Sequence, residues 1–268
     1  MNEKKLRLGL VGKDVSKSLS DKMHAFILQD FGVACEYEKI SVDERGFDGA
    51  IWRLLGDFDG FNVTIPYKRD VMAYLDEIAG DAFAFGSVNT VVTANKTGYN
   101  TDGKGFLLML RLAGVDVANK RVLVLGGGGA GRSSAAALKN AGAEVYVYQR
   151  RQEKLIELCQ ELGVKKATDP ERGGYDILVN CTGVGMHDSV GVSPVSVGAF
   201  QGGTVAVDLI YEPSESAFLK LAKSSGLKTV NGAAMLFYQA YYADCLYLGL
   251  APDDSQAETL YQEYLKNR

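Results

Sequence analysis

The stretch that decides the fold runs from residue 121 to residue 131 and reads Arg121-Val122-Leu123-Val124-Leu125-Gly126-Gly127-Gly128-Gly129-Ala130-Gly131. Residues 121–125 have the apolar pattern of a buried strand, and residues 133–140 have the pattern of a helix. The glycines between them satisfy G-x-G-x-x-G. That pattern is weak in isolation. Between a strand and a helix it is typical of a loop that holds the pyrophosphate of a dinucleotide.

Each position of this loop has a physical role. Gly126 permits the tight turn, Gly128 lets the backbone approach the pyrophosphate, and Gly131 lets the helix pack closely on the strand. We assign Gly129 and Ala130 to the same site because the helix N-terminus supplies N–H groups and the positive end of a dipole. The alternative is a glycine-rich turn without a ligand. A P-loop is excluded because no Gly-Lys-Ser/Thr sequence follows.

The end of the next predicted strand, residues 144–148, indicates which dinucleotide binds. Sites for NAD usually carry an acidic residue there, about 20 residues after the loop, to hold the ribose 2′-hydroxyl. This chain has Arg150 and Arg151 instead. Guanidinium groups bind a 2′-phosphate bidentately, whereas a carboxylate would repel it. The sequence therefore predicts NADP as the cofactor, the alternative being two solvated arginines at the start of a helix.

Helix-length and strand-length apolar patterns alternate along the chain, which predicts an α/β fold. The segments around the glycine loop predict a doubly wound parallel sheet of the Rossmann type, with strands at 121–125, 144–148, 176–180, 204–208 and 228–230 and a helix at 152–162. The earlier part predicts strands at 6–11, 37–42, 60–64 and 88–94, helices at 20–31 and 47–55, and a helix beginning near Pro66. Further helices are predicted at 103–113, 232–248 and 255–267.

Composition and charge limit the class of protein. Hydrophobic residues make up 47% of the chain and charged residues 23%, the balance of a globular protein. A net charge of −4 offers no general attraction to nucleic acid or to an anionic membrane. No basic-then-apolar leader and no membrane-length apolar run occurs, so we expect a cytoplasmic protein. Four scattered cysteines and two histidines predict neither a disulfide framework nor a metal site.

Four polar clusters lie where a predicted strand or loop meets the next element, at residues 18–20, 62–68, 88–90 and 98–102. Ligands of open α/β sheets bind at such junctions. If a helix begins near Pro66, Lys68 faces the positive end of its dipole at a cost of about 0.3–1 kcal/mol, which Asp102 would offset. Such a pair could move a proton to and from a substrate hydroxyl while hydride moves at the neighbouring carbon. The alternatives are a solvated Lys68 and helix caps at Asp102 and Ser20.

Seven motifs follow one another along nearly the whole chain. They are Ser18-x-Ser20 with His24, Phe61-Asn62-Val63-Thr64-x-Pro66-x-Lys68, Gly86-Ser87-Val88-Asn89-Thr90, Asn100-Thr101-Asp102-x-x-Gly105, Asn180-x-Thr182-x-x-Gly185-Met186, Asp208-x-x-Tyr211-x-Pro213 and Gly232-x-x-Met235-Leu236-x-x-Gln239. With these motifs in this order, the chain resembles the shikimate dehydrogenase family.

The resemblance implies reversible, NADP-linked reduction of 3-dehydroshikimate to shikimate, a step toward chorismate and the aromatic amino acids. It implies that Lys68 and Asp102 are the catalytic pair and that Thr182 and Gly232 belong to the cofactor site. The implied substrate-binding residues are Ser18, Ser20, Thr64, Asn89, Tyr211 and Gln239.

The resemblance also implies a substrate domain formed by residues 1–102 and 238–268, with an NADP-binding domain, residues 103–237, inserted between them. A monomer or a homodimer is expected. Asp21 stands where the family usually has proline, and Lys17 where it usually has histidine. These departures leave quinate and an aminoshikimate open as substrates of the same scaffold. A protein that binds a dinucleotide as a sensor, without turnover, is a further alternative.

Overall fold

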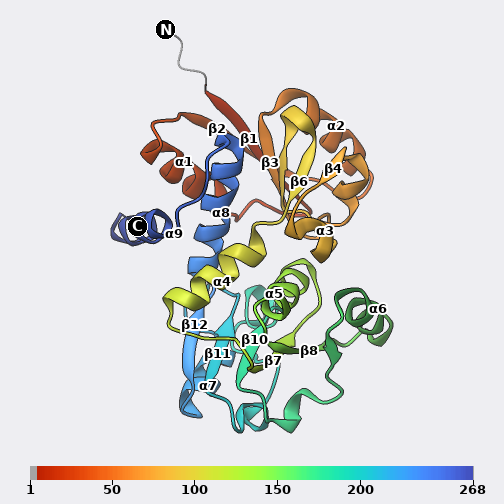
Figure 1. Cartoon of the computed structure of the whole chain (residues 1–268), viewed down its shortest axis with the longest axis vertical. Helices are drawn as coiled ribbons and strands as arrows, with labels where there is room; N and C mark the ends of the chain where they lie inside the picture. Colours follow the sequence, from red (N-terminus) through yellow and green to blue (C-terminus); the bar gives the residue numbers. More distant parts are fainter. Residues whose placement is uncertain (1–4, 268) are drawn as a thin grey trace. The chain divides into compact units, whose positions relative to one another are not determined.

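The computed structural model describes residues 5–267, which fold into two compact units (Figure 1). The first unit comprises the chain up to Lys104 together with residues from Phe237 onward, and the second comprises Gly105–Leu236. The chain passes between the units within helix α4 (Asp102–Leu112) and again within helix α8 (Ala233–Leu248). No helix among residues 5–267 is long and apolar enough to cross a membrane.

The second unit is built on a six-stranded sheet in which every neighbouring pair is parallel. The spatial order is β12-β11-β10-β7-β8-β9, the order of a dinucleotide-binding sheet read from its far edge. The order reverses between β7 and β10, so their carboxyl ends flank the switch point at which such sheets bind ligands. The prediction of a doubly wound sheet is therefore confirmed. The strands are β7 (Arg121–Leu125), β8 (Glu144–Tyr148), β9 (Lys165–Lys166), β10 (Ile177–Asn180), β11 (Val205–Asp208) and β12 (Lys228–Asn231).

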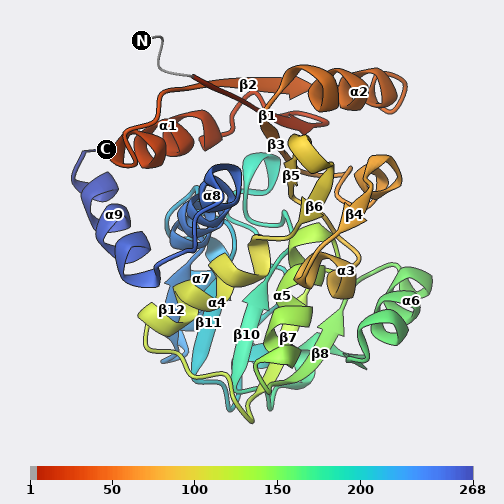
Figure 2. The ribbon, with the colours of Figure 1, turned by 45° about the horizontal axis from the view of Figure 1, so that its top comes forward.

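Helices pack against the strands of this sheet (Figure 2). Helix α5 (Gly129–Asn140) packs against β7 and β8 and beside α6 (Gln152–Leu162), which packs on β8 and β9. Helix α7 (Ala217–Ser224) packs on β11 and β12 and buries Phe218 completely. The short 3-10 helices of this unit are η3 (Pro170–Arg172), η4 (His187–Ser189) and η5 (Val197–Phe200).

The first unit has a mixed six-stranded sheet in the order β2-β1-β3-β5-β6-β4. β1 lies parallel to β2 and β3, whereas β5 lies antiparallel to β3 and β6. β3 illustrates the alternation of faces along a strand. Phe61 and Val63 belong to the apolar cluster with α2, and Asn62 between them faces the other side of the sheet. The strands are β1 (Leu6–Gly12), β2 (Cys35–Ser41), β3 (Gly60–Val63), β4 (Glu77–Ile78), β5 (Thr90–Val92) and β6 (Thr97–Tyr99).

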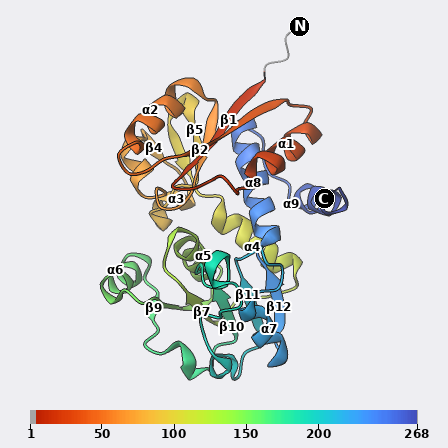
Figure 3. The ribbon, with the colours of Figure 1, turned by 180° about the vertical axis from the view of Figure 1, so that it is seen from behind.

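The C-terminal helices α8 and α9 (Asp254–Lys266) lie beside α1 (Ser20–Asp30), as Figure 3 shows. Aromatic rings join them: the ring centroid of Phe26 lies 5.3 Å from that of Tyr264, and that of Phe31 lies 6.1 Å from that of Tyr241. The last helices therefore complete the first unit. The remaining helices of this unit are α2 (Phe47–Asp57), α3 (Asp81–Phe85), η1 (Asp70–Tyr74) and η2 (Thr93–Asn95).

The prediction that a helix begins near Pro66 is wrong. The chain forms a turn in which the Thr64 carbonyl accepts a hydrogen bond from the Tyr67 N–H at 3.0 Å, and a 3-10 helix starts only at Asp70. The Lys68 carbonyl accepts from the Val88 N–H at 2.8 Å, where an α-helix would have paired it with the Met72 N–H. A contact distant in sequence thus replaces the local helix, and the dipole cost expected for Lys68 does not arise.

Candidate functional site

The first unit contains a nearly buried ion pair between Lys68 and Asp102. Lys68 lies in the turn after β3, and Asp102 is the first residue of α4. The Lys68 Nζ lies 2.6 Å from the Asp102 Oδ2, and the two residues are only 9% and 5% exposed. A charge pair in such a place interacts strongly because little water screens it, and removing one partner leaves an uncompensated buried charge.

Asn89 orients the carboxylate of this pair. Its Nδ2 donates to the Asp102 Oδ1 at 2.8 Å and lies 3.2 Å from the Gln239 Oε1. Its Oδ1 accepts from the Thr101 N–H at 2.8 Å. The structure thus brings Lys68, Asn89, Asp102 and Gln239 together from four separate stretches of the chain. The cluster offers an ammonium donor and amide groups within one small region, a set of groups suited to an oxygen-rich ligand.

The two predicted serines lie at the start of α1. The Ser18 Oγ donates to the Ser20 Oγ at 2.9 Å. Ser20 is the first helical residue and makes no capping hydrogen bond, so the alternative role of helix cap is wrong. Asp21, which stands where the family usually has proline, forms an ion pair with Lys39 at 3.3 Å, and Lys39 also donates to the Ser18 carbonyl at 3.1 Å. These contacts hold the serine segment against β2.

The other two predicted substrate residues occupy different places. Thr64 is half-buried after β3, and its backbone N–H donates to the Val11 carbonyl at 2.9 Å. Tyr211 is half-buried and belongs to the second unit, just after β11.

The sequence assigned no role to the buried polar side chains that are hydrogen-bonded to Asn89. Asn62 Nδ2 donates to Thr90 Oγ1 at 3.2 Å, and Thr90 Oγ1 donates to Asn89 Oδ1 at 3.0 Å.

The sequence motifs at residues 61–68, 86–90 and 100–105 nevertheless contain three such residues, Asn62, Thr90 and Thr101. Polar residues at buried strand positions are the signal that could have marked them, because buried polar groups need partners. Asn100 in the same motif supports the start of α4, since its Oδ1 accepts from the Gly103 N–H at 3.3 Å. The alternative of Asp102 as a helix cap therefore fails, because Asp102 is itself the first helical residue.

The glycine loop of the second unit joins β7 to α5, as the sequence predicted. Gly126 has a φ of +97°, a backbone conformation that favours glycine, and a Cβ on Gly131 would overlap the Gly126 carbonyl. Gly128 occupies the N-cap of α5 without a side-chain cap, and a Cβ there would meet nothing within 4 Å. The N-terminal N–H groups of α5 are thus not capped by a side chain and face a cradle open to an anion, which fits a pyrophosphate.

The end of β8 lies directly beside this loop. The Gly126 N–H donates to the Tyr148 carbonyl at 2.8 Å, and a Cβ on Gly127 would lie 2.6 Å from the Gln149 Oε1. Arg150 and Arg151 follow and are exposed, with Arg151 at the N-cap of α6. Two guanidinium groups next to an anion-binding loop fit a phosphate on the ribose of a dinucleotide.

Thr182 lies on the other side of the glycine loop, after β10. Its methyl carbon would be 2.9 Å from a Cβ placed on Gly126. Its Oγ1 donates to the Asn180 Oδ1 at 2.7 Å, and Asn180 in turn donates to the buried Asp208 at 3.0 Å. The remaining predicted cofactor residue, Gly232, packs so closely on the Leu209 backbone that a side chain would not fit.

Asp208 is a buried carboxylate that the sequence interpretation left without a role. Burial raises the pKa of Asp208, and hydrogen bonds from Ser216, the Ile210 N–H and Asn180 oppose that rise. We expect Asp208→Ala to lower the free energy of unfolding by about 3 kcal/mol because it strands these donors. Asp208→Asn keeps an acceptor for them and removes the charge, so it should be far less destabilising.

The pH dependence distinguishes the charge from the hydrogen bonds of Asp208. Because the folded-state pKa of Asp208 is raised, the contribution of this group to stability is fully present below the ordinary aspartate pKa of about 3.9 and is lost as pH rises through the raised value. Asp208→Asn lacks this loss. Urea unfolding at about pH 4.5 and about pH 7.5 measures the free energy of unfolding of both proteins. The value for Asp208→Asn relative to the wild type should be higher at the higher pH. Equal destabilisation by asparagine and alanine would contradict this account.

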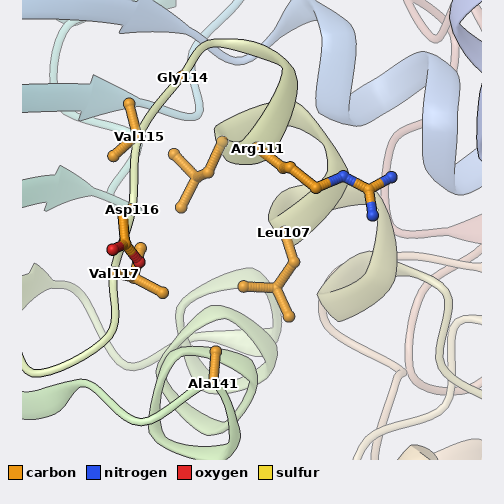
Figure 4. Close-up of a pocket in the computed structure, with 8 residues that line it drawn as sticks. Leu107, Arg111, Gly114, Val115, Asp116, Val117 and Ala141 are labelled. Carbon is orange, nitrogen blue, oxygen red and sulfur yellow. The ribbon is translucent and has the colours of Figure 1, made fainter.

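The second unit also has a pocket that contains none of these groups. It is lined by side chains of α4, of the segment that follows it and of the end of α5, as Figure 4 shows. Its walls are mostly aliphatic, with Arg111 and Asp116 as the charged members. It holds neither an acid–base pair nor an anion cradle, so we do not assign it to the candidate site. The lining residues are Leu107, Leu110, Arg111, Gly114, Val115, Asp116, Val117 and Ala141.

Two family profiles match the chain. The profile described as "Shikimate dehydrogenase substrate binding domain" matches residues 10–91, and that described as "Alanine dehydrogenase/PNT, C-terminal domain" matches residues 90–212. The first covers Lys68, Asn89 and both serines. The second covers Asp102, the glycine loop and both arginines.

Several relatives cover nearly the whole chain. A shikimate dehydrogenase (NADP(+)) from Thermus thermophilus is 38% identical over 94% of this chain and 96% of its own. One from Methanococcus maripaludis is 36% identical over 94% and 95%. The crystal structure of a shikimate 5-dehydrogenase from Thermus thermophilus in complex with NADP(H) and shikimate has a TM-score of 0.87 at 37% identity, covering 96% of this chain and 99% of that one. A ligand-free 5-ketofructose reductase of Gluconobacter sp. has a TM-score of 0.80 at 30% identity, covering 97% and 99%.

Proposed function

The chain belongs to the shikimate dehydrogenase family, and we propose that it catalyses the reversible, NADP-dependent reduction of 3-dehydroshikimate to shikimate. The observation that carries the proposal is the buried contact of 2.6 Å between Lys68 and Asp102, held by Asn89. A proton-transfer pair is what a carbonyl–alcohol interconversion requires of the protein. The Thermus thermophilus relative, similar over nearly the whole chain, is named for this reaction.

Lys68 and Asp102 are proposed to handle the proton at the reacting oxygen. When bound, the cofactor would supply the hydride as NADPH to the carbon that bears this oxygen, or would accept it as NADP+ in the reverse direction. In the reductive direction the Lys68 ammonium donates a proton to the substrate carbonyl oxygen; in the oxidative direction the pair accepts the hydroxyl proton. Asp102 holds the ammonium at 2.6 Å, and Asn89 fixes the second oxygen of the carboxylate. Low exposure keeps water from competing for the same hydrogen bonds.

The substrate is a small cyclic acid with several hydroxyl groups, and it needs many short polar side chains. We propose that Ser18, Ser20, Thr64, Asn89, Tyr211 and Gln239 bind its hydroxyls and carboxylate. The serine pair and Gln239 support this assignment, because both lie on the first unit with the proton-transfer pair. Recognition through hydrogen bonds rejects analogues that lack the matching hydroxyl more strongly than an apolar wall does.

We propose that the cofactor binds to the second unit. Residues of the β7–α5 loop would hold its pyrophosphate, and Arg150 and Arg151 the 2′-phosphate of NADP. Thr182 lies next to Gly126 of the same loop, and Gly232 lets the chain after β12 approach the Leu209 backbone closely. The glycine-loop residues are Gly126, Gly128, Gly129, Ala130 and Gly131.

A quinate or aminoshikimate dehydrogenase on the same scaffold is the second candidate. The similarity to a 5-ketofructose reductase supports this second candidate. A protein with the same fold and 30% identity to this chain is named for a different substrate, so the fold alone does not fix the substrate. A sensor without turnover is disfavoured, since binding alone requires no buried lysine–carboxylate pair. A monomer or homodimer in the cytoplasm remains a prediction that size-exclusion chromatography and cell fractionation would check.

The experiment that tests the proposal follows reduced nicotinamide by absorbance with NADP and with NAD, each against shikimate, quinate and an aminoshikimate. The expected result is turnover of shikimate with NADP, at the highest kcat/KM of the six combinations. A higher kcat/KM for quinate or the aminoshikimate would support the second candidate. Cofactor binding without turnover of any of the three substrates would support a sensor and refute the proposal.

A further inference from the structure

A second buried polar pair lies outside the candidate catalytic pair. The His24 Nδ1 of α1 lies 2.6 Å from the Asp244 Oδ1 of α8, and both side chains are completely buried. His24 follows Ser20 by four residues, so the two lie on one face of α1. Asp244 lies a little more than one turn after Gln239 on α8. The pair therefore joins the two helices that carry proposed substrate-binding residues.

Tyr37 connects this pair to Ser20. The rings of Tyr37 and His24 are stacked, with centroids 4.7 Å apart and planes at 16°. Burial raises the pKa of Tyr37 well above its ordinary value, the Asp244 carboxylate adds to the rise, and the neighbouring Ser20 side chain opposes it. The phenol thus stays protonated at neutral pH and donates to the Asn62 Oδ1 at 2.9 Å.

Hydrogen bonds continue from Asn62 to the catalytic pair. Asn62 reaches Thr90 at 3.2 Å, Thr90 reaches Asn89 at 3.0 Å, and Asn89 reaches Asp102 at 2.8 Å. Every member of this path is buried except Tyr37, which is half-buried. A displacement of Tyr37 would therefore affect both the neighbouring Ser20 hydroxyl and the hydrogen-bonded residues that lead from Asn62 to Asp102.

The His24–Asp244 pair is costly to bury. Burial raises the pKa of Asp244. The charge and the hydrogen bond of His24 oppose this rise but do not cancel it. Within residues 5–267, the His24 Nε2, the Asp244 Oδ2 and the neighbouring Tyr247 hydroxyl have no hydrogen-bond partner. Apolar side chains of similar size would fill this space at lower cost, because a buried pair rarely recovers its desolvation penalty. Such a pair therefore contributes more to fixing α1 against α8 than to the stability of the fold.

We propose that Asp244 and His24 are positioning residues that act through Tyr37 to hold the Ser20 hydroxyl in the geometry that binds the substrate. The pair fixes α1 against α8, and the Tyr37 ring stacked on His24 transmits that position. The phenol hydroxyl donates to Asn62, and the Ser20 side chain neighbours Tyr37 on the same face of α1 as His24. This inference rests on the proposed function, since it takes Ser20 as a substrate-binding residue. Neither Asp244 nor His24 needs to touch the substrate itself.

The test compares Asp244→Ala with Asp244→Asn. Alanine removes the acceptor of His24, and we expect KM for shikimate to rise about tenfold while KM for NADP stays unchanged. Asparagine keeps an acceptor at the Oδ1 position and is expected to restore KM to within about twofold of the wild type. The dissociation constant of shikimate, measured by titration calorimetry, should change in parallel.

Leu54→Ala is the matched control for lost stability. Leu54 is completely buried in the cluster with Phe61 and Val63, on the face of the sheet opposite Asn62. It should lower Tm without changing KM for shikimate. An equal rise of KM in Leu54→Ala and Asp244→Ala would overturn the proposal, as would an unchanged KM in Asp244→Ala.

Tyr37→Phe keeps the inference testable if Asp244→Ala does not fold. It removes only the phenol hydroxyl and retains the stacked ring, so the same selective rise of KM for shikimate is expected; an unchanged KM would overturn the proposal. The wild type separates this result from the proposed function. A wild type that does not turn over shikimate refutes the function and this inference together, whereas turnover with unchanged KM in the variants refutes the inference alone.

Discussion

Replacing Lys68 with methionine is expected to lower kcat for shikimate oxidation about 10³-fold, within the range of a lost general acid–base group. Methionine keeps the aliphatic stem and removes the ammonium that lies 2.6 Å from Asp102. Asp102→Asn is expected to lower kcat by a similar factor, because the amide cannot hold the ammonium as a carboxylate does. The two changes combined should cost no more than either alone, since the residues act as one unit. Initial rates with NADP at saturating shikimate measure each effect.

The controls separate chemistry from folding. Both variants leave a buried charge with fewer partners, so Tm and circular dichroism must show that the fold is retained before kcat is compared. Lys96→Met removes a lysine from the turn between β5 and β6 of the same unit and is expected to leave kcat unchanged. Retention of more than about a tenth of the wild-type kcat in a folded Lys68→Met or Asp102→Asn variant would reject the proposed proton transfer.

The second large effect concerns the cofactor. Replacing Arg150 and Arg151 together with alanine is expected to lower kcat/KM for NADP about 10²- to 10³-fold, because each charge-assisted hydrogen bond to a phosphate contributes about 1.5–3 kcal/mol. The same variant should lose little with NAD, which has no 2′-phosphate. The preference for NADP over NAD would therefore shrink or reverse. Specificity constants for both cofactors, measured at one ionic strength, give this ratio directly.

Arg172→Ala is the control for the loss of positive charge, since Arg172 is an exposed arginine of the same unit on η3. It should leave the cofactor preference unchanged. Equal losses with NADP and NAD in the double arginine variant would indicate damage to the glycine loop or to α6, and would contradict the assignment of these arginines to the 2′-phosphate.

The dinucleotide-binding unit could be predicted because its signals are local. An apolar run, a glycine turn and a helical pattern occur within 20 residues, and only glycine suits a φ of +97° at Gly126 and the contact of Gly131 with the Gly126 carbonyl. The parallel order of β7, β8 and β10 follows from the right-handed crossovers that link such strands. Lys68, Asp102, Asn89 and Gln239 were selected from motifs, so their identity also came from sequence.

The mutual geometry of these residues came only from the tertiary structure. Lys68 was expected in a helix, but the hydrogen bond between its carbonyl and the Val88 N–H places it in a turn. Two-residue strands such as β4 carry too few residues to show a periodicity. His24 and Asp244 are separated by 220 residues and meet in the interior. The chain by itself determined which side chains are available and which local elements they favour; which of them share a hydrogen bond was decided by packing, because a contact 2.6 Å long depends on the register of whole elements.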